Sequence, residues 1–202
     1  MDDFTPAAQA LAADGWCVLP QLLPPEQTAV LRAECAALDA AHAFRRARTG
    51  LERTASMLRT DRTHWFAPDA LSAPQRAYLR RLNALRIALN RNLMLGLVDC
   101  EAHYAVYPVG GGYARHRDCM HYSEARVVSA VYYLNEDWQP DDGGALRLYL
   151  PDGAHHDIVP TGGTLALFLS AQFEHEVLPA KRERTSIACW LRQRQAPEQP
   201  TC

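Results

Sequence analysis

The stretch that decides the fold is Arg126-Val127-Val128-Ser129-Ala130-Val131-Tyr132-Tyr133-Leu134, an alternating run rich in β-branched and aromatic residues. Such a run is typical of a β-strand. Similar short runs, separated by Gly, Pro and Asp turns, recur between Ala102 and Arg192. They predict strands at 103–107, 126–134, 145–150, 156–159, 164–169, 175–178 and 185–192. Seven or eight antiparallel strands in two packed sheets form a jelly roll.

The first hundred residues have a helical pattern instead. Helices are predicted to begin at Thr5, at Pro24 and at Pro74, with one strand at 16–19 between the first two. These helices more naturally brace a sheet than bind a ligand. We therefore predict one α+β domain over residues 1–202 with a mainly β core. Residues 1–100 would supply helical support and a substrate loop, and residues 101–195 the catalytic jelly roll.

Composition sets limits on the class of protein. A chain of 202 residues is long enough for one domain with a full core. The net charge of −2 gives no broad basic field for nucleic acid. Six cysteines without a C-x-x-C spacing indicate reduced thiols. With no apolar signal segment and no stretch of membrane-spanning length, we expect a cytoplasmic protein that binds neither nucleic acid nor membrane.

The most informative side chains are those of His116, Asp118 and His175. On a strand, positions i and i+2 point to the same face, so His116 and Asp118 can hold one ion. Two imidazoles and one carboxylate form the facial triad of non-haem Fe(II) sites, which leaves coordination positions open for a co-substrate and O2. The alternative is a chance His-x-Asp in a surface turn.

Arg184 makes the chance explanation improbable. It stands nine residues after His175 and heads an alternating run that ends at Trp190. A guanidinium on the strand after the distal histidine can pair bidentately with a carboxylate that reaches in from the metal. The dicarboxylate 2-oxoglutarate fits, with one end on iron and the other on Arg184. Arg182 shares the parity of Arg184 but falls in the turn, so we expect it to point to solvent.

Further runs carry a resemblance to a known family. They are Tyr107–Tyr113, Val131–Trp138, Gly143–Leu148 and His175–Ala180, with a weaker match at Arg59-x-Asp61-x-x-x-Trp65. Together they resemble the Fe(II)/2-oxoglutarate-dependent prolyl 4-hydroxylases of the hypoxia-inducible-factor type, including their bacterial relatives. The resemblance implies a double-stranded β-helix, which is a jelly roll with the metal near its open mouth. It also implies Fe(II), 2-oxoglutarate and O2, with ascorbate as an optional reductant.

The resemblance assigns roles to five more side chains. Tyr133 would bind the far carboxylate of 2-oxoglutarate, and Tyr107 would be a tyrosine of the same pocket. Leu146 and Val177 would line that pocket. Trp190 has the parity of Arg184 and should also face the barrel interior, where it would meet the substrate or simply pack. For each of them, a plain core residue is the alternative.

Two features upstream of the core concern the substrate. Asp61 and Arg126 resemble an ion pair that ties a mobile substrate loop to the core of these enzymes, and two unrelated surface charges are the alternative. The basic segment 44–53 could be a lid over a peptide or an irregular stretch. His155 and His156 follow a turn signal, so we interpret them as solvated loop histidines rather than a second metal site.

The implied reaction is hydroxylation of a prolyl residue in a protein substrate, with release of succinate and CO2. The family precedents for that substrate are a translation elongation factor in bacteria and a hypoxia-inducible transcription factor in animals. Two alternatives stay open at this point. One is the same chemistry on a small molecule such as free proline, and the other is a non-catalytic, cupin-like metal or ligand sensor.

Overall fold

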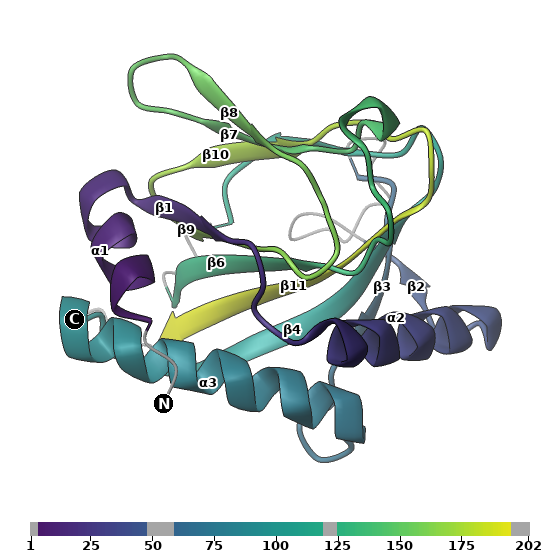
Figure 1. Cartoon of the computed structure of the whole chain (residues 1–202), viewed down its shortest axis with the longest axis horizontal. Helices are drawn as coiled ribbons and strands as arrows, with labels where there is room; N and C mark the ends of the chain where they lie inside the picture. The colour runs from purple at the N-terminus through teal and green to yellow at the C-terminus, as the bar shows by residue number, and fades with distance from the viewer. Residues whose placement is uncertain (1–3, 48–58, 119–124, 195–202) are drawn as a thin grey trace, which may run out of the picture.

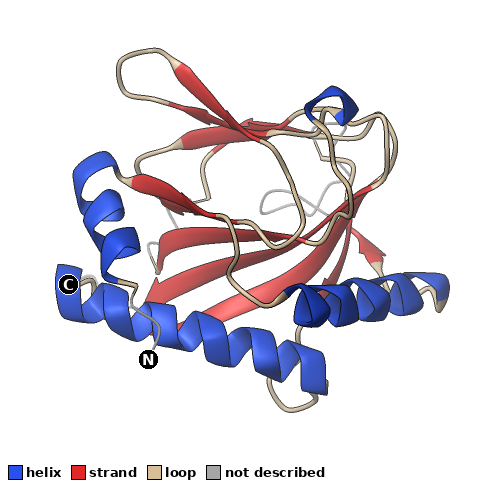
Figure 2. Cartoon of the chain, in the orientation of Figure 1, coloured by secondary structure: helices blue, strands red, loops and turns tan. Residues whose placement is uncertain are grey.

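The computed structural model describes residues 4–47, 59–118 and 125–194. Two antiparallel sheets face each other, and helices lie along the outer side of the larger sheet (Figures 1 and 2). The helices are α1 (Thr5–Asp14), α2 (Pro25–Ala40) and α3 (Ala73–Leu93), with a 3-10 turn η1 (Pro140–Asp142). The predicted jelly roll braced by N-terminal helices is confirmed.

The larger sheet runs in the order β1-β9-β6-β11-β4-β3-β2. Its strands are β1 (Trp16–Leu19), β2 (Arg45–Arg46), β3 (Arg62–Trp65), β4 (Leu97–Tyr107), β6 (Arg126–Tyr133), β9 (Leu165–Leu169) and β11 (Arg184–Gln193). The smaller sheet runs β5-β10-β7-β8. It consists of β5 (Tyr113–His116), β7 (Leu146–Tyr149), β8 (His155–Ile158) and β10 (Glu174–Val177).

Helix α3 shows why the N-terminal part braces the large sheet. Ser72 and Gln75 form a capping box at its start, which satisfies backbone N–H groups that the first turn leaves free. Tyr78 and the leucines on the same stripe are fully buried, and the Tyr78 ring lies 5.5 Å from that of Tyr132 on β6. The apolar face of the helix is therefore packed on the sheet.

Strand alternation divides β6 between two apolar cores. Val128, Ala130 and Tyr132 belong to the cluster shared with the helices, whereas Tyr133 belongs to a smaller cluster shared with the small sheet. Successive side chains on a strand point to opposite faces of the sheet, so this division follows from the geometry of the strand. The face that carries Tyr133 is the one on which the functional site is built.

The structure corrects several expected element boundaries. Strand β4 begins at Leu97 rather than at residue 103, and the short strands β2, β3 and β5 were not predicted. Arg, His and Thr dominate these short strands, so their sequence lacks an apolar alternation, and pairing with longer neighbours supplies their regularity. His155 and His156 lie on β8 rather than in a loop, and the His156 ring packs 4.4 Å from that of Trp16.

Further observations concern the membrane, the cysteines and the basic segment. No helix within the described ranges is long and apolar enough to cross a bilayer. Cys17, Cys35, Cys100 and Cys189 are free thiols. Residues 48–53 of the basic segment lie outside the described residues, so its expected role as a lid is untested.

Candidate active site

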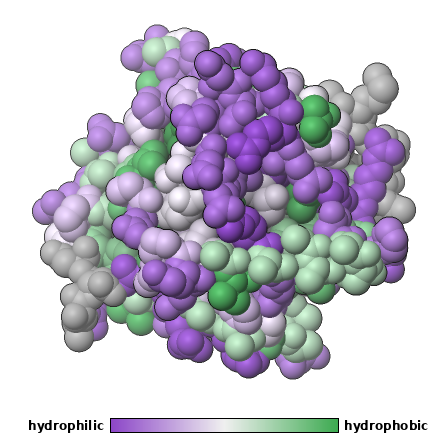
Figure 3. All heavy atoms as spheres, turned by 45° about the vertical axis from the view of Figure 1, so that its right-hand side comes forward, coloured by the Kyte–Doolittle hydropathy of each residue, from purple (hydrophilic) through white to green (hydrophobic). Residues whose placement is uncertain are grey.

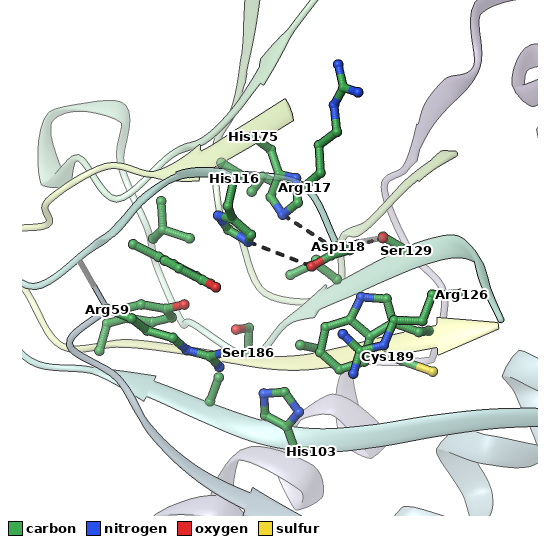
Figure 4. A pocket seen from close by; sticks show the side chains of 18 of the residues that line it. Arg59, His103, His116, Arg117, Asp118, Arg126, Ser129, His175, Ser186 and Cys189 are labelled. Atoms are coloured by element: carbon green, nitrogen blue, oxygen red, sulfur yellow. Dashed lines mark hydrogen bonds and ion pairs between the residues drawn. The ribbon is translucent and has the colours of Figure 1, made fainter. Parts of the chain in front are cut away.

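A cavity of about 350 Å³ lies between the two sheets (Figure 4). His116, Asp118 and His175 line it from the side of the small sheet, and Arg184 and Trp190 line it from the large sheet. Residues that are far apart in the sequence therefore face one another across a single space.

The two histidines are placed by strand pairing. His116 on β5 is the direct partner of His175 on β10, and Asp118 follows two residues after His116. The ligand atoms of the three residues lie within 4.8 Å of one another. Asp118 Oδ1 is 3.7 Å from His116 Nε2, and Asp118 Oδ2 is 3.6 Å from His175 Nε2. The predicted convergence of the triad is confirmed.

Backbone carbonyls fix the orientation of both imidazoles. His116 Nδ1 lies 2.8 Å from the carbonyl oxygen of Ala114, and His175 Nδ1 lies 3.4 Å from that of Phe173. A carbonyl can only accept a hydrogen bond, so the proton of each neutral ring belongs on Nδ1. The lone pair on each Nε2 then faces Asp118, as a metal ligand requires.

The electrostatics favour the protonation states that bind a metal. Burial lowers the pKa of His175 to about 4, so this imidazole is neutral at physiological pH. Burial opposes the charge of Asp118, but the neighbouring imidazoles and a hydrogen bond from Ser129 hold the pKa of its carboxyl well below the usual range. Neutral imidazoles and a carboxylate are the forms that ligate divalent metals.

A short chain of hydroxyls supports Asp118 from the large sheet. Ser129 Oγ on β6 donates to Asp118 Oδ2 at 2.7 Å, and Ser170 Oγ lies 2.8 Å from Ser129 Oγ. Because the single hydroxyl proton of Ser129 goes to the carboxylate, Ser170 must be the donor of the second bond. The carboxylate is thereby oriented before any metal binds.

Arg184 is a buried cation without an anionic partner among the described residues. Only 1% of its surface is exposed, and its guanidinium lies between the rings of Tyr107 and Tyr133, at 5.2 and 5.1 Å. Its Nε donates to the carbonyl of Gly144 and its Nη1 to Ser186 Oγ. Among the residues that the structure describes, Arg184 Nη2 and the Tyr133 hydroxyl have no hydrogen-bond partner. A buried guanidinium of this kind requires an anion, so the cavity suits a carboxylate ligand.

The Gly143-Gly144 pair makes room for this arginine. Gly144 has a φ of 70°, and a Cβ there would lie 2.9 Å from Ala180 Cβ and 3.3 Å from Arg184 Cδ. Any side chain at this position would be strained and would press on the arginine. The absence of a side chain at Gly144 therefore leaves room for Arg184 and also allows the turn.

Comparisons with known proteins agree with this geometry. A family model described as the 2OG-Fe(II) oxygenase superfamily matches residues 102–192. The crystal structure of a Pseudomonas putida prolyl-4-hydroxylase superposes with a TM-score of 0.87 at 41% identity, and the match covers 96% of this chain and 100% of that one. The chain belongs to the 2-oxoglutarate- and Fe(II)-dependent prolyl 4-hydroxylases. His116, Asp118 and His175 are thus the Fe(II) ligands, and 2-oxoglutarate is the co-substrate.

Two further relatives of this prolyl 4-hydroxylase are informative. A Trichoplax adhaerens prolyl hydroxylase, in complex with a hypoxia inducible factor oxygen degradation domain peptide fragment, has a TM-score of 0.82 at 28% identity. That match covers 92% of this chain and 87% of that one. Rat Egl nine homolog 1 is 40% identical over 95 residues, which are 45% of this chain and 28% of that protein. The shared segment is thus less than a third of the rat protein.

Of the other residues predicted for the co-substrate end, Tyr107, Leu146 and Val177 also line the cavity, and the fully buried Tyr133 does not. Leu146 and Val177 are buried on the small sheet and belong to the apolar cluster between the sheets as well. Trp190 shares the inner face with Arg184, as strand alternation predicts. Arg182 is exposed and pairs with Asp142 at 3.1 Å, in agreement with its predicted position in the turn.

The predicted ion pair between Asp61 and Arg126 is wrong. Asp61 is fully buried and forms a bidentate pair with Arg59, at 2.6 and 2.8 Å. Arg126 pairs with Glu101 at 2.7 Å and stacks over the ring of Trp190 at 3.7 Å. The reason is proximity. Arg59 is two residues from Asp61 in the chain, and Glu101 stands opposite Trp190 in the sheet, the residue over which Arg126 lies. Arg126 and Arg59 line the cavity, and Asp61 acts by holding Arg59.

Sequence reasoning missed several cavity residues, and four of them had a signal. Arg59 and Trp65 lie in the quoted Arg-x-Asp-x-x-x-Trp match. Ser129 has the parity of Tyr133 on β6, and His103 has the parity of Tyr107 on β4. Since inward positions on a strand repeat every second residue, extending the pattern from each tyrosine would have identified both.

Proposed function

We propose that the protein hydroxylates C4 of a prolyl residue in a protein or peptide. One atom of O2 enters the hydroxyl group and the other enters succinate, as 2-oxoglutarate loses CO2. One observation carries the proposal: a 2-His-1-carboxylate triad shares a cavity with a buried guanidinium that has no anionic partner among the described residues. This combination suits one metal and one dicarboxylate together.

Different residues of the chain would bind the metal and the co-substrate. His116, Asp118 and His175 would hold Fe(II), which with O2 and the co-substrate supplies the oxidation of the C–H bond. Arg184 and the Tyr133 hydroxyl would bind the distal carboxylate of 2-oxoglutarate, because each has a buried polar group with no partner in the described ranges. Tyr107, Leu146 and Val177 would pack against its carbon chain and exclude water.

The open side of the cavity supports a peptide substrate. Trp65 is 49% exposed, and its ring lies 6.2 Å from that of Trp190. An exposed tryptophan beside a catalytic cavity is typical of a surface that packs against a partner. Arg126, stacked on Trp190 and paired with Glu101, adds polar groups at the same side. A translation elongation factor is the first substrate protein to test.

Mass spectrometry of a lysate tests the proposal. Incubation with the enzyme, Fe(II) and 2-oxoglutarate should add the mass of one oxygen to a proline in a lysate protein. The Asp118→Ala variant should add none, whereas Asp69→Ala, which changes an exposed turn residue, should behave as wild type. Oxidation of free proline alone would favour the small-molecule alternative. No succinate release under any condition would favour a non-catalytic sensor.

A further inference from the structure

We propose that His103 is a substrate-binding residue, whose imidazole donates a hydrogen bond to a backbone carbonyl of the bound prolyl peptide. The inference deepens the proposed function and rests on it. It assigns a role to a side chain that neither holds the metal nor pairs with Arg184.

His103 is a polar side chain with its hydrogen bonding unmet. It lies on β4, lines the cavity and is only 1% exposed, yet neither of its ring nitrogens has a hydrogen-bond partner within the described part of the chain. Buried side-chain polar atoms in folded proteins nearly always have a partner. The exception here faces a cavity that binds ligands, so the missing partner is most simply a ligand atom.

Two tryptophans hold the imidazole in place. The rings of Trp65 and Trp190 lie 4.5 and 5.4 Å from the His103 ring, and we call these three residues the aromatic shelf. Trp190 Nε1 is likewise buried, and none of the described residues is its hydrogen-bond partner. The aromatic shelf therefore combines flat apolar surface with unused hydrogen-bond donors.

The position of the aromatic shelf separates it from the co-substrate end. Tyr107 stands opposite Arg184 in the sheet, and His103 lies four residues earlier on β4, about 13 Å along the strand. Figure 4 shows His103 on the side of the cavity opposite His116 and His175. A dicarboxylate that spans from Arg184 to the metal is directed away from this end, so the ligand at the shelf is a different molecule.

The chemistry of the shelf matches a prolyl peptide. Burial lowers the pKa of His103 to about 3, so the ring is neutral and offers one N–H donor and one acceptor. The Trp190 indole offers only a donor. A prolyl residue has no backbone N–H but presents carbonyl oxygens on both sides of its ring. Donors beside flat aromatic rings therefore suit carbonyls beside a pyrrolidine ring.

The effect of His103 on the stability of the free protein distinguishes a substrate-binding role from a structural one. A histidine that the fold itself needs would have its nitrogens bonded, as His64 does through Nδ1 to the carbonyl of Ala43. An unbonded imidazole destabilises the free protein, and an apolar replacement removes that cost. Positions where a polar residue lowers stability are typically functional.

The test uses His103→Leu and His103→Phe, with His103→Gln as the variant that keeps a donor. The substrate is a synthetic peptide containing a proline that wild type hydroxylates. We expect both apolar variants to lower kcat/KM for the peptide by about three- to tenfold, the worth of one neutral hydrogen bond. The KM for 2-oxoglutarate and the Kd for Mn(II) should not change. His103→Gln should recover much of the peptide kcat/KM.

Thermal unfolding gives the second readout. Whichever of the Leu and Phe variants packs better should unfold at a higher temperature than wild type, although it is the poorer enzyme. The matched control His64→Leu should do the reverse, with a lower unfolding temperature and unchanged peptide kcat/KM. A change in the KM for 2-oxoglutarate in place of the peptide kinetics would overturn the inference, and so would unchanged peptide kinetics.

Loss of stability in all three His103 variants would also overturn it, because the imidazole would then be structural. These failures are distinct from failure of the proposed function. If wild type hydroxylates the peptide and the variants match it, only the role of His103 is refuted. If wild type hydroxylates no prolyl peptide, the proposed function and this inference fall together.

Discussion

The two sides of the cavity differ in how their polar groups are satisfied. At the metal site, the Nδ1 atoms of His116 and His175 on the small-sheet side face backbone carbonyls, and Ser129 donates to Asp118 from the large sheet. Elsewhere on the large-sheet side, three cavity-lining side chains keep buried polar atoms without a partner among the described residues: Arg184, His103 and Trp190. The same holds for the hydroxyl of Tyr133, whose ring lies beside Arg184. The protein itself thus completes the metal site, whereas the opposite wall completes its hydrogen bonding only when ligands bind.

This difference has a physical reason. A metal site must orient its ligands before the ion arrives, so the atoms that do not face the metal are best fixed by the protein. A wall that binds exchangeable ligands must keep its donors free, at a cost in stability.

The largest effect should come from removing a metal ligand. Asp118→Ala should weaken Mn(II) binding and peptide hydroxylation by more than about 100-fold, because loss of a mere supporting partner already costs roughly 10–100-fold. Calorimetric titration with Mn(II) and a succinate assay measure the two quantities. An Asp118→Ala protein that kept most of its metal affinity and turnover would show that the triad is assigned wrongly.

The next largest effect should be on the KM for 2-oxoglutarate alone. Arg184→Ala should raise the KM for 2-oxoglutarate by about 10- to 100-fold, the range for a hydrogen bond to a charged group. Arg184→Lys should raise it less, because the charge remains but the bidentate fork is lost. Mn(II) affinity should stay near that of wild type. The exposed Arg182→Ala is the matched control, and an equal effect there would contradict the assignment.

A third prediction concerns the stability of the metal-free protein in acid. The pKa of His103 falls from 6.5 to about 3 on folding because burial disfavours its charged form. The unfolded chain therefore binds the proton more tightly, and stability is lost as pH falls below about 6.5. At pH 5 the loss from this residue should be about 2 kcal/mol. Urea unfolding at pH 7.5 and pH 5 should show a smaller loss for His103→Leu, and equal losses would contradict burial of a neutral imidazole.

The smallest effect should arise where the large sheet supports the metal site. Ser129→Ala removes the donor to Asp118 and should weaken Mn(II) binding by about tenfold. Ser170→Ala, one hydrogen bond further from the carboxylate, should have a smaller effect. Mn(II) titration of both variants measures this order. The reverse order would mean that Ser170, rather than Ser129, orients the carboxylate.

Much of the site could be predicted from the sequence because the spacing of residues within one strand decides which side chains share a face. His116 and Asp118 share a face by their spacing, and Arg184 and Trp190 share one for the same reason. The longer strands were also predictable, since their apolar alternation runs over many residues. The short strand β5 was not, because its four residues carry no such pattern and pairing with β10 defines it.

The partner of each charged or polar side chain could not be deduced before the sheets were placed together. The sequence alone placed Asp61 and Arg126 near the substrate, but it could not show that Arg59 and Glu101 are their partners. Nor could it show that His103 is left without one. Strand alternation is a property of the backbone and can be deduced from one segment. Pairing depends on the register between strands and on the reach of long side chains, which exist only once the sheets have assembled.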